Sequence, residues 1–163
     1  MKELYELAAR IAHILKARRE TIAVAESSAG GLISAALLSV PGASAYYLGG
    51  GVVYTKKARD LLMAIPDADT KGMRSSSQPY AQLLARTARD RFAATWGISE
   101  TGAAGPTGNR YGDKAGHTCV AIAGAGGIQH AMTLETGSDD RAANMESFAL
   151  AAMELLLRHL DGV

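Results

Sequence analysis

The chain has 163 residues, and its 17 basic and 16 acidic side chains give a formal net charge of +1. Its length suits one domain of ordinary size, and a hydrophobic content of 48% excludes a disordered chain. The nearly neutral charge gives no electrostatic reason to expect a nucleic-acid or membrane partner, although a few local charges and backbone amides suffice to bind a small anion. We therefore expect a single domain over residues 1–163.

Signals for targeting, disulfides and metals are lacking. The single cysteine, Cys119, excludes an intramolecular disulfide, which fits a reducing cytoplasm, and its apolar neighbours favour a buried strand residue over a catalytic thiol. The N-terminus has no apolar signal core, and no apolar stretch reaches the roughly 20 residues that a membrane span needs. The four histidines are scattered without the spacing of a metal site, so we expect no structural metal.

The first part of the chain predicts a helix, a strand and a second helix. Apolar residues at three- and four-residue steps predict an amphipathic helix over 3–18. The short apolar run 21–25 predicts a buried strand. Ser27 or Ser28 is expected to cap the following helix, which covers about 30–39.

The middle of the chain predicts two more strands and two more helices. A strand is expected over 46–54, where three consecutive glycines indicate a bulge or a close approach of another backbone. A short helix over 57–65 follows, and Ser77 is expected to cap a longer helix. The next strand covers 97–101 and leads into a glycine-rich loop over 102–112.

The last part predicts a hairpin and a final helix. Strands over 117–123 and 129–134 flank a glycine-rich turn, and the helix covers about 141–159. Because helices alternate with apolar strands, we expect an α/β fold: a single three-layer domain with a mostly parallel, mixed sheet and helices on both faces. The hairpin requires at least one antiparallel pair in that sheet.

Three unusual segments, 25–31, 51–59 and 101–112, lie where strands are expected to end. Ligands of open α/β sheets bind beyond the carboxyl ends of the strands, so these segments predict one site. Free amides at the helix start after 25–31 would suit a phosphate or an oxyanion, and Glu26 and Ser27 add reactive groups. The alternatives are a capped, closely packed helix and, for Glu26, a partner for a backbone amide or an arginine.

The glycine-rich segment 101–108 matches none of the common site motifs. It lacks the Gly-Lys-Ser/Thr of a P-loop, and the chain has no Gly-x-Gly-x-x-Gly dinucleotide fingerprint. The chain also has no Gly-x-Ser-x-Gly elbow of an α/β-hydrolase. These absences exclude three site types and leave the function open.

Ala-Glu-Ser-Ser-Ala-Gly-Gly at 25–31 resembles the Ala-Glu-Ser-Cys-Thr-Gly-Gly segment of the CinA C-terminal domain family. Thr-Gly-Ala-Ala-Gly-Pro at 101–106 is similar to the family's Thr-Gly-x-Ala-Gly-Pro motif. Further segments follow in the family's order at 40–54, 114–118 and 137–141. The resemblance covers almost the whole chain, and its ordered segments are far more specific than any one motif.

The resemblance implies amide hydrolysis of nicotinamide mononucleotide to nicotinate mononucleotide and ammonia, without a cofactor. Ser27 matches the family's catalytic serine, Tyr54 its active-site tyrosine, and Arg141 an arginine near the substrate. The other substrate-binding candidates are Glu26, Ser28, Gly30, Gly31, Thr101 and Gly102. We also expect a phosphorylated nucleotide as the partner, a homo-oligomer and a cytoplasmic location. The pyrophosphatase domain of two-domain CinA proteins is not expected in a chain of this length.

The chain departs from the family most clearly at Arg59, where a lysine is usual. A desolvated lysine can lose its proton and act as a base, whereas an arginine, with a pKa of roughly 12 or above, cannot. We keep Arg59 as a catalytic-site candidate that can bind a phosphate or stabilise an anion, with Lys56 and Lys57 close in sequence. Asn144 and Met145 stand where a second arginine is usual.

Three functions remain open. The leading hypothesis is a hydrolase of the nicotinamide-nucleotide amidase type, which the presence of Ser27, Tyr54, Thr101 and Arg141 supports. The alternative is a catalytically weak or silent paralogue that binds a nucleotide or another phosphorylated small molecule, which the change to Arg59 supports. A third is an assembly protein with a vestigial pocket. An ammonia-release assay with nicotinamide mononucleotide separates the first from the other two.

Overall fold

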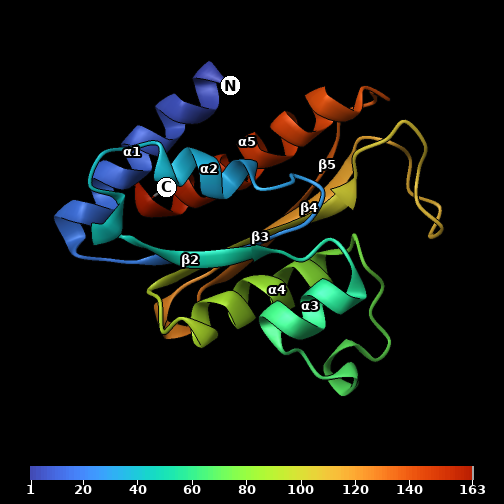
Figure 1. Cartoon of the computed structure of the whole chain (residues 1–163), viewed down its shortest axis with the longest axis horizontal. Helices are drawn as coiled ribbons and strands as arrows, with labels where there is room; N and C mark the ends of the chain where they lie inside the picture. The colour runs from blue at the N-terminus through green and yellow to red at the C-terminus, as the bar shows by residue number, and fades with distance from the viewer. Residues whose placement is uncertain (163) are drawn as a thin grey trace.

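A five-stranded sheet lies between two layers of helices in the computed structural model, which describes residues 1–162 (Figure 1). The helices are α1 (Lys2–Arg18), α2 (Leu32–Leu38), α3 (Lys56–Met63), α4 (Gln78–Arg91) and α5 (Arg141–Leu160). The strands are β1 (Ile22–Glu26), β2 (Tyr47–Val52), β3 (Trp96–Ala103), β4 (His117–Ala123) and β5 (Gln129–Glu135). All the predicted helices and strands are present, with their ends moved by a residue or two.

The sheet is mixed, with the strand order β2-β1-β3-β4-β5. β1 is parallel to both β2 and β3, whereas β3, β4 and β5 form an antiparallel meander. The parallel strands are joined through helices, because a tight turn cannot connect two parallel strands. The predicted α/β fold with a mixed sheet is confirmed.

Helices cover both faces of the sheet, as predicted. Figure 1 shows α1, α2 and α5 on one face and α3 and α4 on the other. The apolar faces of α2, α3, α4 and α5 pack on the sheet, and α1 packs on α5 and α2. Burying a large apolar side chain contributes about 1.5–3 kcal/mol. The largest fully buried side chains on the α1, α2 and α5 side include Tyr46, Phe148, Leu4, Ile11, Leu15 and Leu37. Within residues 1–162, no helix combines the length and the apolar character needed to cross a membrane.

Gly50, the middle one of the three glycines of β2, lets this edge strand lie close to β1. The register between the two strands shifts by one residue, which leaves Leu48 without a pairing partner in β1. A Cβ atom on Gly50 would lie 2.4 Å from the Val24 carbonyl oxygen, closer than any side chain allows. The predicted bulge and the predicted close backbone approach are therefore both present.

Candidate active site

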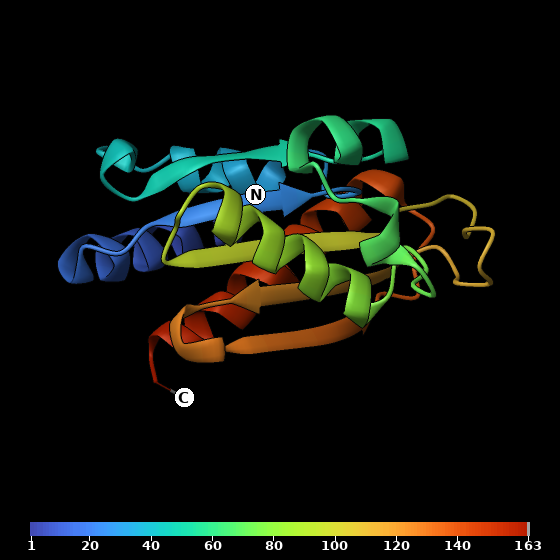
Figure 2. The ribbon, with the colours of Figure 1, turned by 90° about the horizontal axis from the view of Figure 1, so that it is seen from below.

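The carboxyl ends of β1, β2 and β3 lie side by side at one edge of the sheet (Figure 2). Near the end of β1, Ala25 pairs with Gly51 of β2 and with Ser99 of β3. The loops that leave these three strands consequently meet at the same edge. This is the position in which open α/β sheets hold their ligands.

A cavity of about 360 Å³, here called the site cavity, brings four of the predicted residues together at this edge. Ser27 comes from the loop after β1, Tyr54 from the segment after β2, and Thr101 and Gly102 from the end of β3. The other lining residues are Val53, Thr55, Lys56, Ser75, Ser76, Tyr80, Asn109, Arg110 and Tyr111. A serine, cationic side chains and tyrosine rings thus share a space of the size that small-molecule sites have.

A second cavity, of about 230 Å³, adjoins the site cavity, since Tyr54 and Gly102 line both. Ser28 and Arg141, which were also predicted as site residues, line this second cavity. The Arg141 guanidinium donates to the Tyr54 hydroxyl, at 3.1 Å, and to the Gly105 carbonyl, at 2.5 Å. These bonds hold a cation where the two cavities meet.

Glu26, which was predicted to bind substrate, lines neither cavity. The side chain is fully buried, and its carboxylate accepts hydrogen bonds from the amides of Gly31 (2.8 Å), Ile33 (3.2 Å) and Ser34 (3.0 Å). Helix α2 has no side-chain cap from the residue that precedes it, so Glu26 satisfies its first amides and opposes its positive end. The predicted serine cap is therefore wrong. Of the two interpretations left open for Glu26, the partner of backbone amides is the one observed.

The loop amides expected to bind a substrate anion are bound by the chain itself. Gly30 donates to the Ser27 carbonyl, at 3.0 Å, and Gly31 donates to Glu26. Neither glycine, both predicted to bind substrate, lines either of the two cavities. Of the five amides in this loop, only that of Ser28 has no carbonyl or carboxylate partner within residues 1–162.

The start of α5 packs directly on this loop. Gly30 has a φ of +68°, and a Cβ atom there would lie 2.6 Å from the terminal carbon of Met145. Glycine at this position therefore serves backbone conformation and close packing. Asn144 is 1% exposed and donates to the carbonyls of Ala104 (2.8 Å) and Ser138 (2.9 Å). The two residues that replace the family's second arginine thus make structural contacts.

Glu100 of β3, which sequence reasoning missed, binds the loop that carries Ser27. Its fully buried carboxylate accepts from the amides of Ser27 (3.1 Å) and Ala29 (2.7 Å) and from the hydroxyls of Ser28 (2.8 Å) and Thr118 (3.0 Å). Burial raises the pKa of Glu100 above the usual carboxyl value, although the four donors favour its charged form. Sequence reasoning could have found Glu100, because a charged residue inside a strand that is expected to be buried needs polar partners.

Arg59, which was predicted to belong to the catalytic group, lines neither cavity. It is 7% exposed, and its guanidinium donates to Asp60 at 3.0 and 3.2 Å and lies 3.5 Å from Asp67. Burial lowers the pKa of Arg59, but its hydrogen bonds to Asp60 and Tyr80 outweigh burial, so the pKa is raised overall. Its contact with Tyr80 directs this side chain toward α4. The guanidinium is a permanent cation in a structural ion pair.

Lys56, three residues earlier on α3, lines the site cavity instead. Its ammonium group lies 2.7 Å from Asp60 and 3.1 Å from Asp67. Hydrogen bonds to these two carboxylates raise the pKa of Lys56, so the group is protonated at neutral pH. In this arrangement Lys56 supplies positive charge and cannot accept a proton.

Thr101 is hydrogen-bonded to Ser76. Ser76 has a φ of +57° and also lines the site cavity. The Ser76 amide donates to the Thr101 hydroxyl at 3.1 Å, and the Ser76 carbonyl accepts from His117 Nε2 at 2.7 Å. His117 Nδ1 faces the Glu135 carboxylate. Burial lowers the pKa of His117, but the contacts with Glu135 and Ser76 outweigh burial and raise it overall.

The loop between β3 and β4 supplies a part of the cavity wall that sequence reasoning did not identify. Asn109 shapes this loop, because its side-chain oxygen accepts from the amides of Tyr111 (3.0 Å) and Asp113 (3.1 Å). Arg74 donates to the Asp113 carboxylate at 2.5 and 3.1 Å, which ties the loop to the segment before α4. Sequence reasoning could have found this wall from Arg110 and Tyr111, a cationic and an aromatic residue side by side in a glycine-rich loop.

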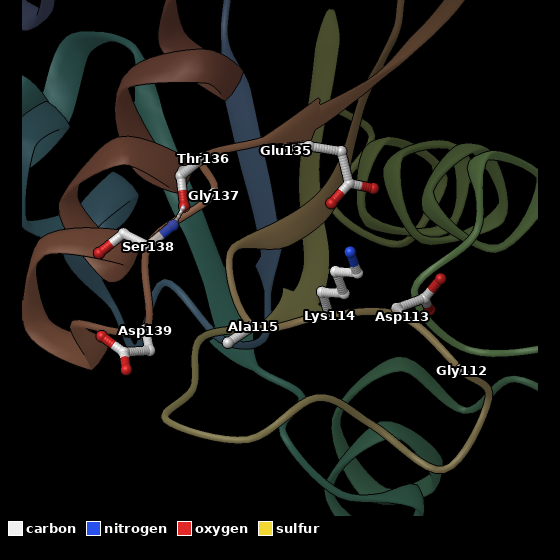
Figure 3. Close-up of a pocket in the computed structure, with 9 residues that line it drawn as sticks. All are labelled: Gly112, Asp113, Lys114, Ala115, Glu135, Thr136, Gly137, Ser138 and Asp139. Carbon is white, nitrogen blue, oxygen red and sulfur yellow. Dashed lines mark hydrogen bonds between the residues drawn. The ribbon is translucent and has the colours of Figure 1, made fainter.

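A larger cavity, of about 1070 Å³, lies between residues 112–115 and 135–139 (Figure 3). None of the predicted site residues lines it, and it mixes one lysine, Lys114, with the carboxylates of Asp113, Glu135 and Asp139. Because its three carboxylates outnumber the one lysine, this cavity does not offer the cationic lining that a phosphate needs. No group of three His, Cys, Asp or Glu side chains within residues 1–162 is arranged to hold a metal ion.

The sequence and the fold can now be compared with known proteins. Residues 4–160 match the family described as the CinA C-terminal domain. The chain belongs to the CinA C-terminal domain family. The CinA-like proteins of Anaeromyxobacter sp. (strain Fw109-5) and Salinibacter ruber are each 38% identical to it, over 94% and 95% of this chain. The chain spans only 38% and 37% of the length of these two relatives.

Solved structures of CinA-type proteins have the same fold. The competence/damage inducible protein CihA from Agrobacterium tumefaciens is 27% identical, with a TM-score of 0.89 over 98% of this chain and 96% of that one. A CinA superfamily protein from Klebsiella pneumoniae is 25% identical, with a TM-score of 0.90 over 98% of this chain and 99% of that one. The similarity extends over the whole described chain, including the edge of the sheet at which the site cavity lies.

Proposed function

We propose that this protein hydrolyses the carboxamide of nicotinamide mononucleotide to give nicotinate mononucleotide and ammonia. The observation that carries the proposal is that Ser27, Tyr54 and Thr101 line one cavity at the carboxyl edge of the sheet. Membership of the CinA C-terminal domain family supports the reaction type, since that family includes nicotinamide-nucleotide amidases. The residues that line this cavity, Ser27, Tyr54 and Thr101, also lie in the segments that resemble the family.

In the proposed reaction the Ser27 hydroxyl attacks the carboxamide carbon. The serine proton passes to the leaving nitrogen, the C–N bond breaks, ammonia leaves, and the nicotinoyl group is held as an ester on Ser27. Water then hydrolyses the ester, which restores the serine and releases the carboxylate product. The oxygen of each tetrahedral intermediate carries negative charge, and the protonated Lys56 and the unpartnered Ser28 amide are the nearby groups that can stabilise it.

The remaining lining residues match the other parts of this substrate. Tyr54, Tyr80 and Tyr111 line the site cavity with aromatic rings, a type of side chain that attracts the positively charged pyridinium ring. Arg110 and Arg141 offer guanidinium groups to the phosphate. Positive charge and aromatic surface therefore lie on the same side of the sheet as the serine.

A second candidate function is nucleotide binding with little or no turnover. The observation that favours it is the absence, among the described residues that line the site cavity, of a neutral amine that would take the Ser27 proton. Arg59 is turned away, and Lys56 is held in its protonated form by two carboxylates. This candidate keeps the ligand of the first proposal and removes only the chemistry.

Two measurements on the same sample distinguish the candidates. Ammonia release from nicotinamide mononucleotide, with Ser27→Ala as the control, tests hydrolysis, and titration calorimetry with the same nucleotide tests binding. Release by the wild type but not by Ser27→Ala is the expected result. Binding without release supports the second candidate, and neither binding nor release at millimolar nucleotide contradicts both.

A further inference from the structure

Ser27 lies in a short loop whose shape depends on hydrogen bonds to a buried carboxylate of the sheet. Glu100 is fully buried in β3, the strand that neighbours β1 in the sheet. Its oxygen Oε2 accepts from the Ser27 amide at 3.1 Å and from the Ala29 amide at 2.7 Å. These two amides lie on either side of Ser28, so one oxygen atom fixes both ends of the turn.

The other carboxylate oxygen completes the arrangement. Oε1 accepts from the Ser28 hydroxyl at 2.8 Å and from the Thr118 hydroxyl at 3.0 Å. Thr118 belongs to β4, so the carboxylate links the loop after β1 to two further strands of the sheet. The two amides can only donate, and the Thr118 hydroxyl shares its single proton between Oε1 and the Thr101 carbonyl, which lies 3.1 Å away. These donors favour the charged carboxylate, whereas burial favours the neutral acid.

Glu100 also differs from the other buried carboxylate beside this loop. The Glu26 carboxylate binds the amides at the start of α2 and forms no hydrogen bond with Ser27. Glu100 binds the Ser27 amide itself and leaves the Ser27 hydroxyl outside its set of donors. The hydroxyl therefore stays available to the site cavity, which Ser27 lines.

We infer that Glu100 is a positioning residue for Ser27: its carboxylate, acting as an acceptor of four hydrogen bonds, holds the turn in the one shape that presents the serine hydroxyl to the site cavity. The inference rests on the proposed function, since it assigns Ser27 as the nucleophile. Glu100 does not line either cavity and acts only through the loop. A nucleophile displaced by about 1 Å loses roughly a hundredfold in rate, so such a residue affects turnover more than binding.

Three variants separate positioning from general stability. Glu100→Gln keeps an oxygen for the two amides and places an NH2 group opposite two hydroxyls that can rotate to accept it. Glu100→Met keeps a side chain of similar length and removes all four acceptors. Ser99→Ala, the neighbouring residue in β3, removes a buried hydrogen bond to Ala81 and leaves the Ser27 loop untouched.

The first measurement does not depend on activity. Amide hydrogen exchange, followed by NMR on the wild-type protein, is expected to give the Ser27 and Ala29 amides the slow exchange of strand amides, because a buried carboxylate binds both. In Glu100→Gln the protection persists, and in Glu100→Met it is lost at these two amides. Fast exchange of both amides in the wild type overturns the inference, whether or not the protein hydrolyses anything and whether or not Glu100→Met folds.

The second measurement is ammonia release with nicotinamide mononucleotide. We expect kcat to fall about a hundredfold in Glu100→Met with KM changed less than about threefold, and to fall less than about tenfold in Glu100→Gln. Ser99→Ala is expected to keep kcat within about threefold of the wild type. A fall in kcat that is equal in Glu100→Met and Ser99→Ala contradicts positioning. Protected Ser27 and Ala29 amides in a wild type that releases no ammonia contradict the proposed function and leave the Glu100 arrangement intact.

Discussion

The loop after β1 holds Ser27 through buried contacts, whereas the first turn of α3 presents Lys56 through exposed ones. Two fully buried carboxylates bind most of the loop amides, and the start of α5 packs against the loop. Lys56 meets its two carboxylate partners with a side chain that is 63% exposed. Ser27 is thus fixed by buried hydrogen bonds, while the Lys56 ammonium group is held by exposed ion pairs that water and salt weaken.

This difference bears on what the chain is able to do. A buried hydrogen-bonded loop presents the serine in one geometry, which favours chemistry at that atom. An exposed ion-paired lysine can change partners when an anionic substrate arrives, but it begins as a cation. The catalytic question for this protein therefore concerns the proton acceptor and not the nucleophile.

The largest expected effect tests the fixed region. Ser27→Ala removes only the attacking oxygen, so we expect ammonia release to fall by at least about a thousandfold while the affinity for nicotinamide mononucleotide changes little. Steady-state kinetics and calorimetry measure the two quantities. Residual turnover within about tenfold of the wild type would show that Ser27 is not the nucleophile.

A smaller effect is expected in the exposed region, where the identity of the cation matters. Lys56→Met removes the one ammonium group that lines the site cavity in the described chain, and we expect kcat/KM to fall by about tenfold to a hundredfold. Lys57→Met is the matched control, because Lys57 is exposed and lines neither cavity. It should change kcat/KM by less than about twofold.

Arg59→Lys sharpens the same comparison. The position four residues before the end of α3 is turned toward Asp60 and Tyr80, so a lysine there meets carboxylates and not Ser27. We expect kcat to change by less than about threefold, whereas a lysine at this position that acted as the base would raise kcat by at least about tenfold. A tenfold or greater gain in kcat would mean that the side chain at 59 reaches the site cavity during turnover.

The free energy of unfolding tests the contacts that α5 makes through Asn144. Asn144→Ala leaves two buried carbonyls, those of Ala104 and Ser138, without their donor. We expect the free energy of unfolding in urea to fall by about 1–3 kcal/mol. The exposed neighbour Ala142→Ser is the control and should change it by less than about 0.5 kcal/mol. Equal effects of the two variants would remove Asn144 from the contacts that fix the loop.

The smallest effect is a dependence of stability on pH through His117. Its pKa is raised in the folded protein, so its contribution is complete below the unfolded value of about 6.5 and is lost as the pH rises through the folded value. We expect the difference in melting temperature between the wild type and His117→Gln to be largest near pH 6 and to shrink above it. A difference that grows with pH would reverse the assigned direction.

The sequence alone determined much of this protein. Apolar periodicity and glycine positions predict all the helices and strands, since these signals are local and the helices and strands are long enough to express them. The ordered motifs predict the family, and the ends of the predicted strands predict that Ser27, Tyr54 and Thr101 meet. Cys119, interpreted as a buried strand residue, is buried in β4.

The tertiary structure decided which polar groups are used by the fold and which face the cavity. Glu26 and Glu100 both lie within strands, but whether a buried carboxylate meets a substrate or a backbone amide depends on loops that fold back from elsewhere in the chain. Arg59 and Lys56 are three residues apart on one helix, and packing of α3 against α4 alone turns one inward and the other to the cavity. A hydrogen bond between residues more than 70 positions apart, such as that from the Ser27 amide to Glu100, has no local signature, because it exists only once the sheet has assembled.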